Sequence, residues 1–156
     1  MAKLSKVCTC LWFDGDAEAA ATFYTSLLPD SRIDDVIRFD PEGQVLLVAF
    51  TLGGAPFQAL DGGPEYTLTP AASISVVTAD QAETDRLWNA LIADGGSESR
   101  CGWLEDRFGL SWQIVPEVVP RLLAARDRAA AGRAMQALLG MRRIDIAALE
   151  AAYRGE

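Results

Sequence analysis

The sequence contains no histidine, and this absence restricts its chemistry more than any other feature. Imidazole is a frequent ligand of catalytic transition metals and the side chain best suited to general acid–base chemistry near neutral pH. We therefore expect neither a metal site that combines histidine with carboxylates nor catalysis by a histidine base.

Cysteine is scarce as well, with only three residues: Cys8, Cys10 and Cys101. Cys8 and Cys10 are two positions apart on a predicted strand, where side chains point the same way but are poorly placed to bridge. We expect free thiols in a reducing compartment, so the predicted location is cytoplasmic.

Long apolar runs are also missing, since none approaches the roughly 20 residues that span a bilayer. The N-terminus shows no signal-peptide pattern, because its first apolar run contains Thr9 and ends at Asp14. Half of the 156 residues are hydrophobic, which is enough for one compact body with a core. We expect no membrane association.

The whole chain has a formal net charge of −8, and positive charge is sparse in its body, residues 1–116. Half of the Lys and Arg residues lie after residue 116. Nucleic-acid binding needs clustered cations, so we expect no nucleic-acid partner. A tail of interleaved arginines and acids is predicted to dock on the acidic body, either its own or a partner's.

What the sequence does contain is a strand–helix–three-strand pattern that occurs twice. Alternating and helical apolar spacings, caps and turn glycines define the elements. In the first copy the strands are 6–14, 32–39, 44–52 and 56–60, and the helix starts at Asp16. In the second copy they are 72–78, 97–101, 103–105 and 110–115, and the helix starts at Asp80.

The copies align at an offset of 64 residues, which pairs Thr9 with Ser73 and Asp16 with Asp80; the last strands pair Gln58 with Gln113. We predict an α+β fold with two βαβββ modules, about 6–61 and 72–116. They form a curved mixed sheet with helices on the outer face. Residues 117–156 form a C-terminal helical extension that is not an independent domain.

Several motifs carry a resemblance to a known family: residues 10–16 (CLWFDGD), 62–64 (GGP), 73–75 (SIS) and 101–116 (CGW…FGLSWQIVP). They resemble the PhnB-like branch of the vicinal oxygen chelate superfamily, which includes glyoxalase I, bleomycin-resistance proteins and extradiol dioxygenases. That branch is also labelled 3-demethylubiquinone-9 3-methyltransferase. Residues 141–153 of the tail resemble the same group. The resemblance implies a homodimer with a ligand cavity in each cup, the concave side of the curved sheet.

In this superfamily the metal ligands lie on the first and last strand of each module, and the resemblance places those positions at Thr9, Gln58, Ser73 and Gln113. Hydroxyls and amides are poor ligands for Zn²⁺, Ni²⁺ or Fe²⁺. We therefore predict no metal, no cofactor, and neither glyoxalase I nor dioxygenase activity. The glycine pairs 53–54 and 62–63 are interpreted as turn residues rather than as a methyl-donor site.

The same four residues are predicted to form a neutral polar floor that binds a small organic ligand. Trp103 is placed at the rim, and the predicted apolar wall consists of Val7, Leu11, Leu60 and Val77. The alternative is that the polar residues bond one another or water, and that Trp103 is ordinary packing.

The sequence leaves two classes of function open, with a third beside them. The first is a metal-independent small-molecule-binding protein similar in logic to the bleomycin-resistance proteins. The alternative is a metal-independent isomerase, lyase or transferase that uses Cys101, or a cavity carboxylate, with Glu98 as one candidate base. A structural dimer with a vestigial cup is the third.

Trp12, Trp88 and Trp112 are predicted to be core residues, and residues 105–107 are predicted to form a solvated turn tip.

Overall fold

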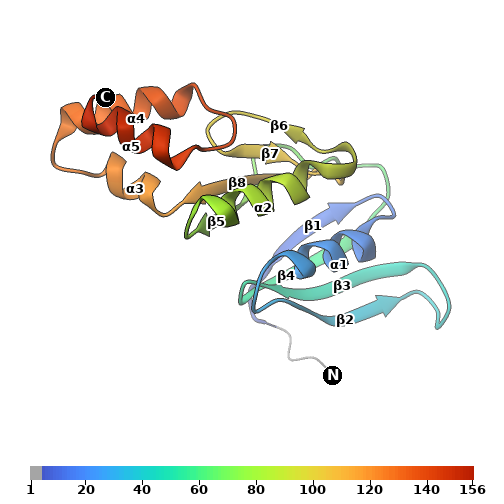
Figure 1. The fold of residues 1–156 in the computed structure, drawn as a ribbon. Helices are drawn as coiled ribbons and strands as arrows, with labels where there is room; N and C mark the ends of the chain where they lie inside the picture. Colours follow the sequence, from blue (N-terminus) through green and yellow to red (C-terminus); the bar gives the residue numbers. More distant parts are fainter. Residues whose placement is uncertain (1–4) are drawn as a thin grey trace. The chain divides into compact units, whose positions relative to one another are not determined.

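The computed structural model describes residues 5–156 and divides the chain into two compact units, one ending at Leu68 and one running from Thr69 to Glu156. Each unit contains one βαβββ module, and the second also contains the C-terminal helices. The predicted α+β architecture of two such modules with a helical extension is confirmed (Figure 1).

The first module is a four-stranded mixed sheet with one helix. Strand β1 pairs in parallel with β4, and β3 pairs antiparallel with both β4 and β2, which gives the order β1-β4-β3-β2. The elements are β1 Thr9–Phe13, α1 Ala17–Leu27, β2 Arg32–Arg38, β3 Val45–Leu52 and β4 Ala55–Asp61.

The second module repeats this plan with shorter middle strands. Strand β5 pairs in parallel with β8, and the order is β5-β8-β7-β6. The elements are β5 Ser73–Thr78, α2 Gln81–Ile92, the short 3₁₀ helix η1 Ala93–Gly95, β6 Ser97–Glu98, β7 Trp103–Glu105 and β8 Ser111–Pro116.

Each helix buries one face of its sheet, and this decides which strand residues are available on the other face. In the first module the ring of Tyr24 from α1 lies 6.5 Å from that of Phe50 in β3, and both side chains are buried. Because side chains alternate along a strand, Val48 and Leu52 share that face. We call the face turned away from the module's helix the distal face.

The two modules differ by one residue between the first strand and the helix. Strand β1 places Cys10 beside Gln58, whereas β5 places Ser75 beside Gln113. The strand offset is therefore one residue larger than the offset of 64 that aligns Asp16 with Asp80. The extra residue lies in the turn at Gly15, whose φ of +87° suits glycine.

The helix starts depend on acidic side chains, as predicted, although not always on the predicted one. Asp80 accepts a hydrogen bond from the Glu83 amide, and Glu83 accepts one from Ala79, which completes a capping box. The side chain of Asp16 makes no capping bond; Asp61 of β4 instead accepts from the Ala17 amide at 2.9 Å. The first helix is thus capped from its own sheet.

The C-terminal extension packs on the second module. Helices α3 (Val118–Leu123), α4 (Arg128–Leu139) and α5 (Ile146–Arg154) share an apolar cluster with Ile144. At Gly102 an added Cβ would meet Ile144 and the Ile114 carbonyl, each at 2.8 Å, so only glycine fits. Of the helices in the described chain, none is both long and apolar enough to cross a membrane.

Asp106, predicted to be solvated, is instead buried with 2 % of its surface exposed. One oxygen accepts from the Phe108 and Leu110 amides, and the other accepts from the indole of Trp112 at 2.8 Å. A carboxylate that accepts several N–H groups is stable without a cation partner. Trp88 and Trp112 are core residues, as predicted.

We predict that Asp106→Ala lowers the free energy of unfolding by about 2–4 kcal/mol, because it strands a buried indole N–H and two turn amides. Urea denaturation measures the change. Glu105→Ala, which removes the exposed neighbouring carboxylate, is the matched control and should change stability by less than about 0.5 kcal/mol. Equal effects would contradict this role for Asp106.

Candidate functional site

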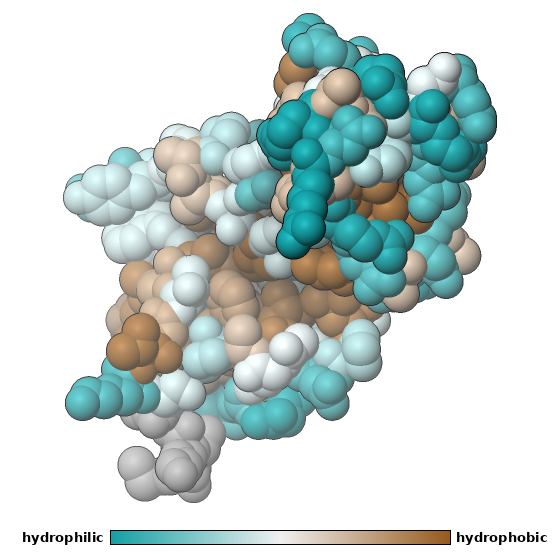
Figure 2. Space-filling model, turned by 90° about the vertical axis from the view of Figure 1, so that its left-hand side faces the viewer, coloured by the Kyte–Doolittle hydropathy of each residue, from teal (hydrophilic) through white to brown (hydrophobic). Residues whose placement is uncertain are grey.

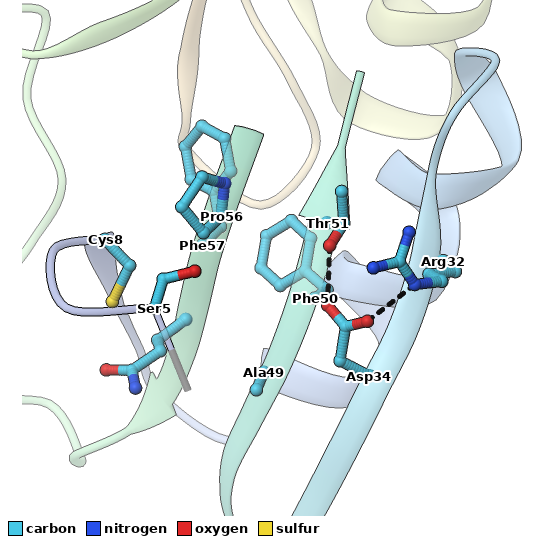
Figure 3. A pocket seen from close by; sticks show the side chains of 10 residues that line it. Ser5, Cys8, Arg32, Asp34, Ala49, Phe50, Thr51, Pro56 and Phe57 are labelled. Carbon is cyan, nitrogen blue, oxygen red and sulfur yellow. Dashed lines mark hydrogen bonds and ion pairs between the residues drawn. The ribbon is translucent and has the colours of Figure 1, made fainter. Parts of the chain in front are cut away.

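The distal face of the first module holds a cavity of about 300 Å³. Figure 3 shows its side chains, which come from β2, β3, β4 and the segment before β1. The lining residues are Ser5, Cys8, Arg32, Asp34, Ala49, Phe50, Thr51, Pro56, Phe57 and Gln58. Of the predicted site residues, only Gln58 is among them.

A charged pair and a hydroxyl form one wall of this cavity. Arg32 Nε donates to Asp34 Oδ1 at 2.7 Å, and Thr51 donates from its hydroxyl to Asp34 Oδ2 at 2.7 Å (Figure 3). The register between β2 and β3 shifts at this point: Ile33 pairs with Phe50 and Asp35 with Ala49, so Asp34 has no partner across the ladder. Such a bulge re-aims side chains locally.

Hydrophobic side chains surround this polar wall. Pro56 and Phe57 line the cavity, and several large apolar residues of the same module are exposed, Val7 at 80 % among them. Figure 2 shows that hydrophobic residues, in brown, also reach the surface in the middle of the view. A few polar groups among apolar ones is the usual composition of a small-molecule site.

Thr9 does not share a face with Gln58, contrary to the sequence prediction. Its partner across the ladder is Phe57, which stacks on the buried Phe50 at 5.4 Å, so Thr9 points to the helix-covered face. The one-residue difference between the modules explains the error, because a shift of one residue reverses every side chain of a strand. Cys10 occupies the place beside Gln58 instead.

The predicted apolar wall is corrected in the same way. Leu11 is buried at 5 % exposure on the helix side with Ala59 as its partner. Leu60 does lie on the distal face, next to Trp12 in the ladder. Val77 is 65 % exposed in the second module.

In the second module the predicted polar residues do come together. Gln113 donates from its side-chain amide to the hydroxyl of Ser73 at 2.9 Å. Trp103 is the direct antiparallel partner of Gln113, so both lie on the same, distal face, and Trp103 is half-buried. The three residues form one polar and aromatic strip, in which Ser73 and Gln113 bond each other.

Trp12 is not a core residue, because it also lies on the distal face of the first module. Its indole donates to the Gly63 carbonyl at 2.8 Å, and its ring meets Tyr66 edge-on at 5.0 Å. A Cβ on Gly62 would collide with the Trp12 ring. These glycines are therefore explained by Trp12, and the pair at 53–54 by the turn between β3 and β4, which leaves neither as a nucleotide cradle.

The donor set does not fit the divalent metal that the resemblance implies. Across residues 5–156 no three His, Cys, Asp or Glu side chains are grouped so that they could hold an ion. Beside Gln58 stands Cys10, whose pKa is raised by partial burial and by the neighbouring Cys8, which disfavours the thiolate that metals require.

The other two candidates for chemistry belong to the second module. Cys101 is half-buried against the C-terminal apolar cluster, and its amide donates to the Met141 carbonyl at 2.8 Å. Glu98 accepts from the indole of Trp88 at 2.9 Å and pairs with Arg142 at 3.4 Å. The Trp88 hydrogen bond, followed by Arg142 and Arg143, lowers the pKa of Glu98, so it is a weak base.

Sequence reasoning missed Arg32, Asp34 and Thr51. Arg32 and Thr51 are direct cross-strand partners, and alternation from Arg32 was the one signal available for Asp34. None of the three lies at a position where the resemblance places a metal ligand.

Comparison with known proteins gives one family. Residues 5–115 match the model of the family described as 3-demethylubiquinone-9 3-methyltransferase. A solved structure from Bacillus cereus, described as a putative 3-demethylubiquinone-9 3-methyltransferase and PhnB protein, is 34 % identical. The match covers 72 % of this chain and 99 % of that one, with a TM-score of 0.66. No curated protein matches the chain.

Two further structures share the fold. A protein from Pseudomonas aeruginosa is 25 % identical over 73 % of this chain and 98 % of its own, with a TM-score of 0.61. A variant of the fosfomycin resistance protein FosX from Listeria monocytogenes, solved with Mn(II) and a dihydroxypropylphosphonic acid, is 12 % identical over 72 % and 93 %, with a TM-score of 0.51. The family match ends before α3, so the resemblance expected for the tail lies outside it.

We predict that Glu98 stabilises the fold only while it is ionised. Because its pKa is lowered on folding, its contribution is present above the ordinary value of 4.5 and is lost as pH falls through the lower folded value. Glu98→Gln should therefore destabilise the protein at neutral pH, and the difference from the native chain should shrink toward about pH 3.

Chemical denaturation at both pH values measures this difference, with Glu105→Gln on the neighbouring strand as the control. A Glu98→Gln deficit that is the same at both pH values would show that the lost charge is irrelevant.

Proposed function

The chain belongs to the 3-demethylubiquinone-9 3-methyltransferase family, within the superfamily of glyoxalases and bleomycin-resistance proteins, and from this premise we propose that it is a small-molecule-binding protein that works without a metal. The observation that carries the proposal is the cavity of about 300 Å³ on the distal face of the first module, with its Arg32–Asp34–Thr51 wall.

The lining of the cavity supports binding more than it supports catalysis by a metal. Gln58 and Thr51 offer uncharged donors and acceptors, and Arg32 offers a fixed cation. Pro56, the cross-strand partner of Thr51, supplies apolar surface on the same face for a small organic ligand. We propose that Gln58, as predicted, contacts the ligand of this cavity, and that Ser73, Gln113 and Trp103 form a separate polar surface on the second module.

A metal-independent enzyme has less support. Cys101, the weak nucleophile candidate, packs against the C-terminal cluster and does not line this cavity. Among the described residues that line the cavity the one carboxylate is Asp34, whose two oxygens accept from Arg32 and Thr51. A general base must reach the substrate proton, and these two contacts fix the carboxylate on the cavity wall.

We also propose that the protein is a cytoplasmic homodimer. Apolar side chains that are exposed on one module, such as Phe39 at 67 %, are of the kind that an interface covers. Light scattering coupled to size-exclusion chromatography measures the mass directly, and a monomeric mass at micromolar concentration would contradict the dimer.

We predict that Ala49→Phe abolishes ligand binding, because Ala49 lines the cavity between Asp35 and Gln58 and a ring there fills the space. Native mass spectrometry of protein purified without added metal should show a small organic adduct on the native chain. The adduct should disappear from the Ala49→Phe chain.

Ala55→Phe is the matched control: Ala55 begins β4, is exposed and does not line the cavity, so the adduct should persist. Elemental analysis of the same sample should find no stoichiometric divalent ion. An adduct that survives Ala49→Phe, or a stoichiometric metal, would contradict the proposed function.

A further inference from the structure

We infer that the ligand of this cavity carries a carboxylate group, and that Arg32 binds it through its two terminal nitrogens. This inference rests on the proposed function, because it identifies the ligand class of the same cavity. The geometry of the Arg32–Asp34–Thr51 group is what points to it.

The guanidinium of Arg32 is held through its Nε, which leaves its Nη1–Nη2 edge for a ligand. Its ion pair with Asp34 uses Nε, at 2.7 Å from Oδ1. No second ion pair of this guanidinium is found within residues 5–156. The Nη1–Nη2 edge of a guanidinium matches the two oxygens of a carboxylate, and such paired bonds are strong and directional.

Asp34 acts here as a positioning residue. Thr51 holds its second oxygen, so the carboxylate is fixed between β3 and Arg32. The side chain of Asp34 is 23 % exposed and that of Arg32 is 66 % exposed. The anchoring end of the pair is therefore the better buried one, and the cation reaches outward beside the cavity, as Figure 3 shows.

The wall has little positive charge to spare for a ligand. Among the described residues that line the cavity Arg32 is the one cation and Asp34 the one carboxylate, so their charges balance, while Gln58 and Thr51 are neutral. The chain as a whole carries a net charge of −8, so each additional negative charge is opposed. A carboxylate monoanion fits this balance better than a phosphonate or phosphate dianion.

The remainder of the lining indicates a compact apolar body for the ligand. Pro56 flanks the end of the cavity near Thr51, and Ala49 leaves space on its floor. A carboxylate on a small aromatic or branched aliphatic group would put its charge at Arg32 and its hydrocarbon against these side chains. Benzoate is therefore a suitable probe.

The test compares benzoate with benzamide, which has the same shape without the charge, and with phenylphosphonate. Two-dimensional ¹H–¹⁵N NMR of the full-length protein follows the amides of residues 49–55, 57 and 58 during each titration. We expect benzoate to bind about tenfold or more tightly than benzamide, and phenylphosphonate at pH 8 to bind more weakly than benzoate.

Arg32→Gln should remove the preference for benzoate over benzamide. Arg32→Lys should keep only part of it, because lysine retains the charge but not the paired donors. Arg38→Gln is the matched control: it lies on the same strand, changes the net charge equally and pairs with Glu18 rather than with the cavity. It should keep the full preference. The spectrum of each variant also reports whether the fold is intact.

The outcomes separate this inference from the proposed function. Equal binding of benzoate and benzamide, a preference that survives Arg32→Gln, tighter binding of phenylphosphonate, or no response to any carboxylate would each overturn the carboxylate assignment. The proposed function would still stand if an organic adduct were lost on Ala49→Phe. If that adduct were also insensitive to Ala49→Phe, the cavity itself would be excluded as the site.

Discussion

The burial of one face of each sheet under a single helix is the constraint on which the rest of this structure depends. Strand side chains alternate, so once α1 covers Phe50 and Val48, their neighbours Ala49 and Thr51 must point to the distal face. The second module obeys the same rule: Trp112 and Ile114 are buried at 1 % and 0 % exposure, and Gln113 between them is turned away. Strand side chains that could contact a ligand are therefore limited to every second residue, the ones that point to the distal face.

That alternation also explains how far the sequence could predict the structure. Caps, turn glycines and apolar periodicity predicted both βαβββ modules, and β7 at Trp103–Glu105 was placed to the residue. The face of β1 could not be read from its own residues, because Cys10, Leu11, Trp12 and Phe13 are all compatible with burial. Aligning by helix caps then transferred the wrong face, since Gly15 adds a residue that the caps do not reveal.

Polar side chains escaped prediction where tertiary partners decide their state. Asp106 in a Glu-Asp-Arg turn has the composition of a solvated tip, yet an indole from its own hairpin makes it a buried acceptor. Asp61 directly follows the predicted strand 56–60, yet its side chain caps α1. The Ala17 amide is 44 residues from Asp61, so local propensity carries no signal for that cap. Asp106 is only six residues from Trp112, but its burial depends on how the indole packs rather than on the turn composition.

The asymmetry between the modules agrees with the proposal that the ligand binds to the first. Strand β2 has seven residues, and its bulge at Asp34 presents Arg32 and Asp34 beside Thr51. The corresponding strand β6 has two residues, and its Glu98 is engaged by Trp88 and by Arg142 from the extension. The second module has thus used this edge to hold the C-terminal helices. In the first module the same edge carries Arg32, which Asp34 positions, and it lies apart from the positions where the resemblance places metal ligands.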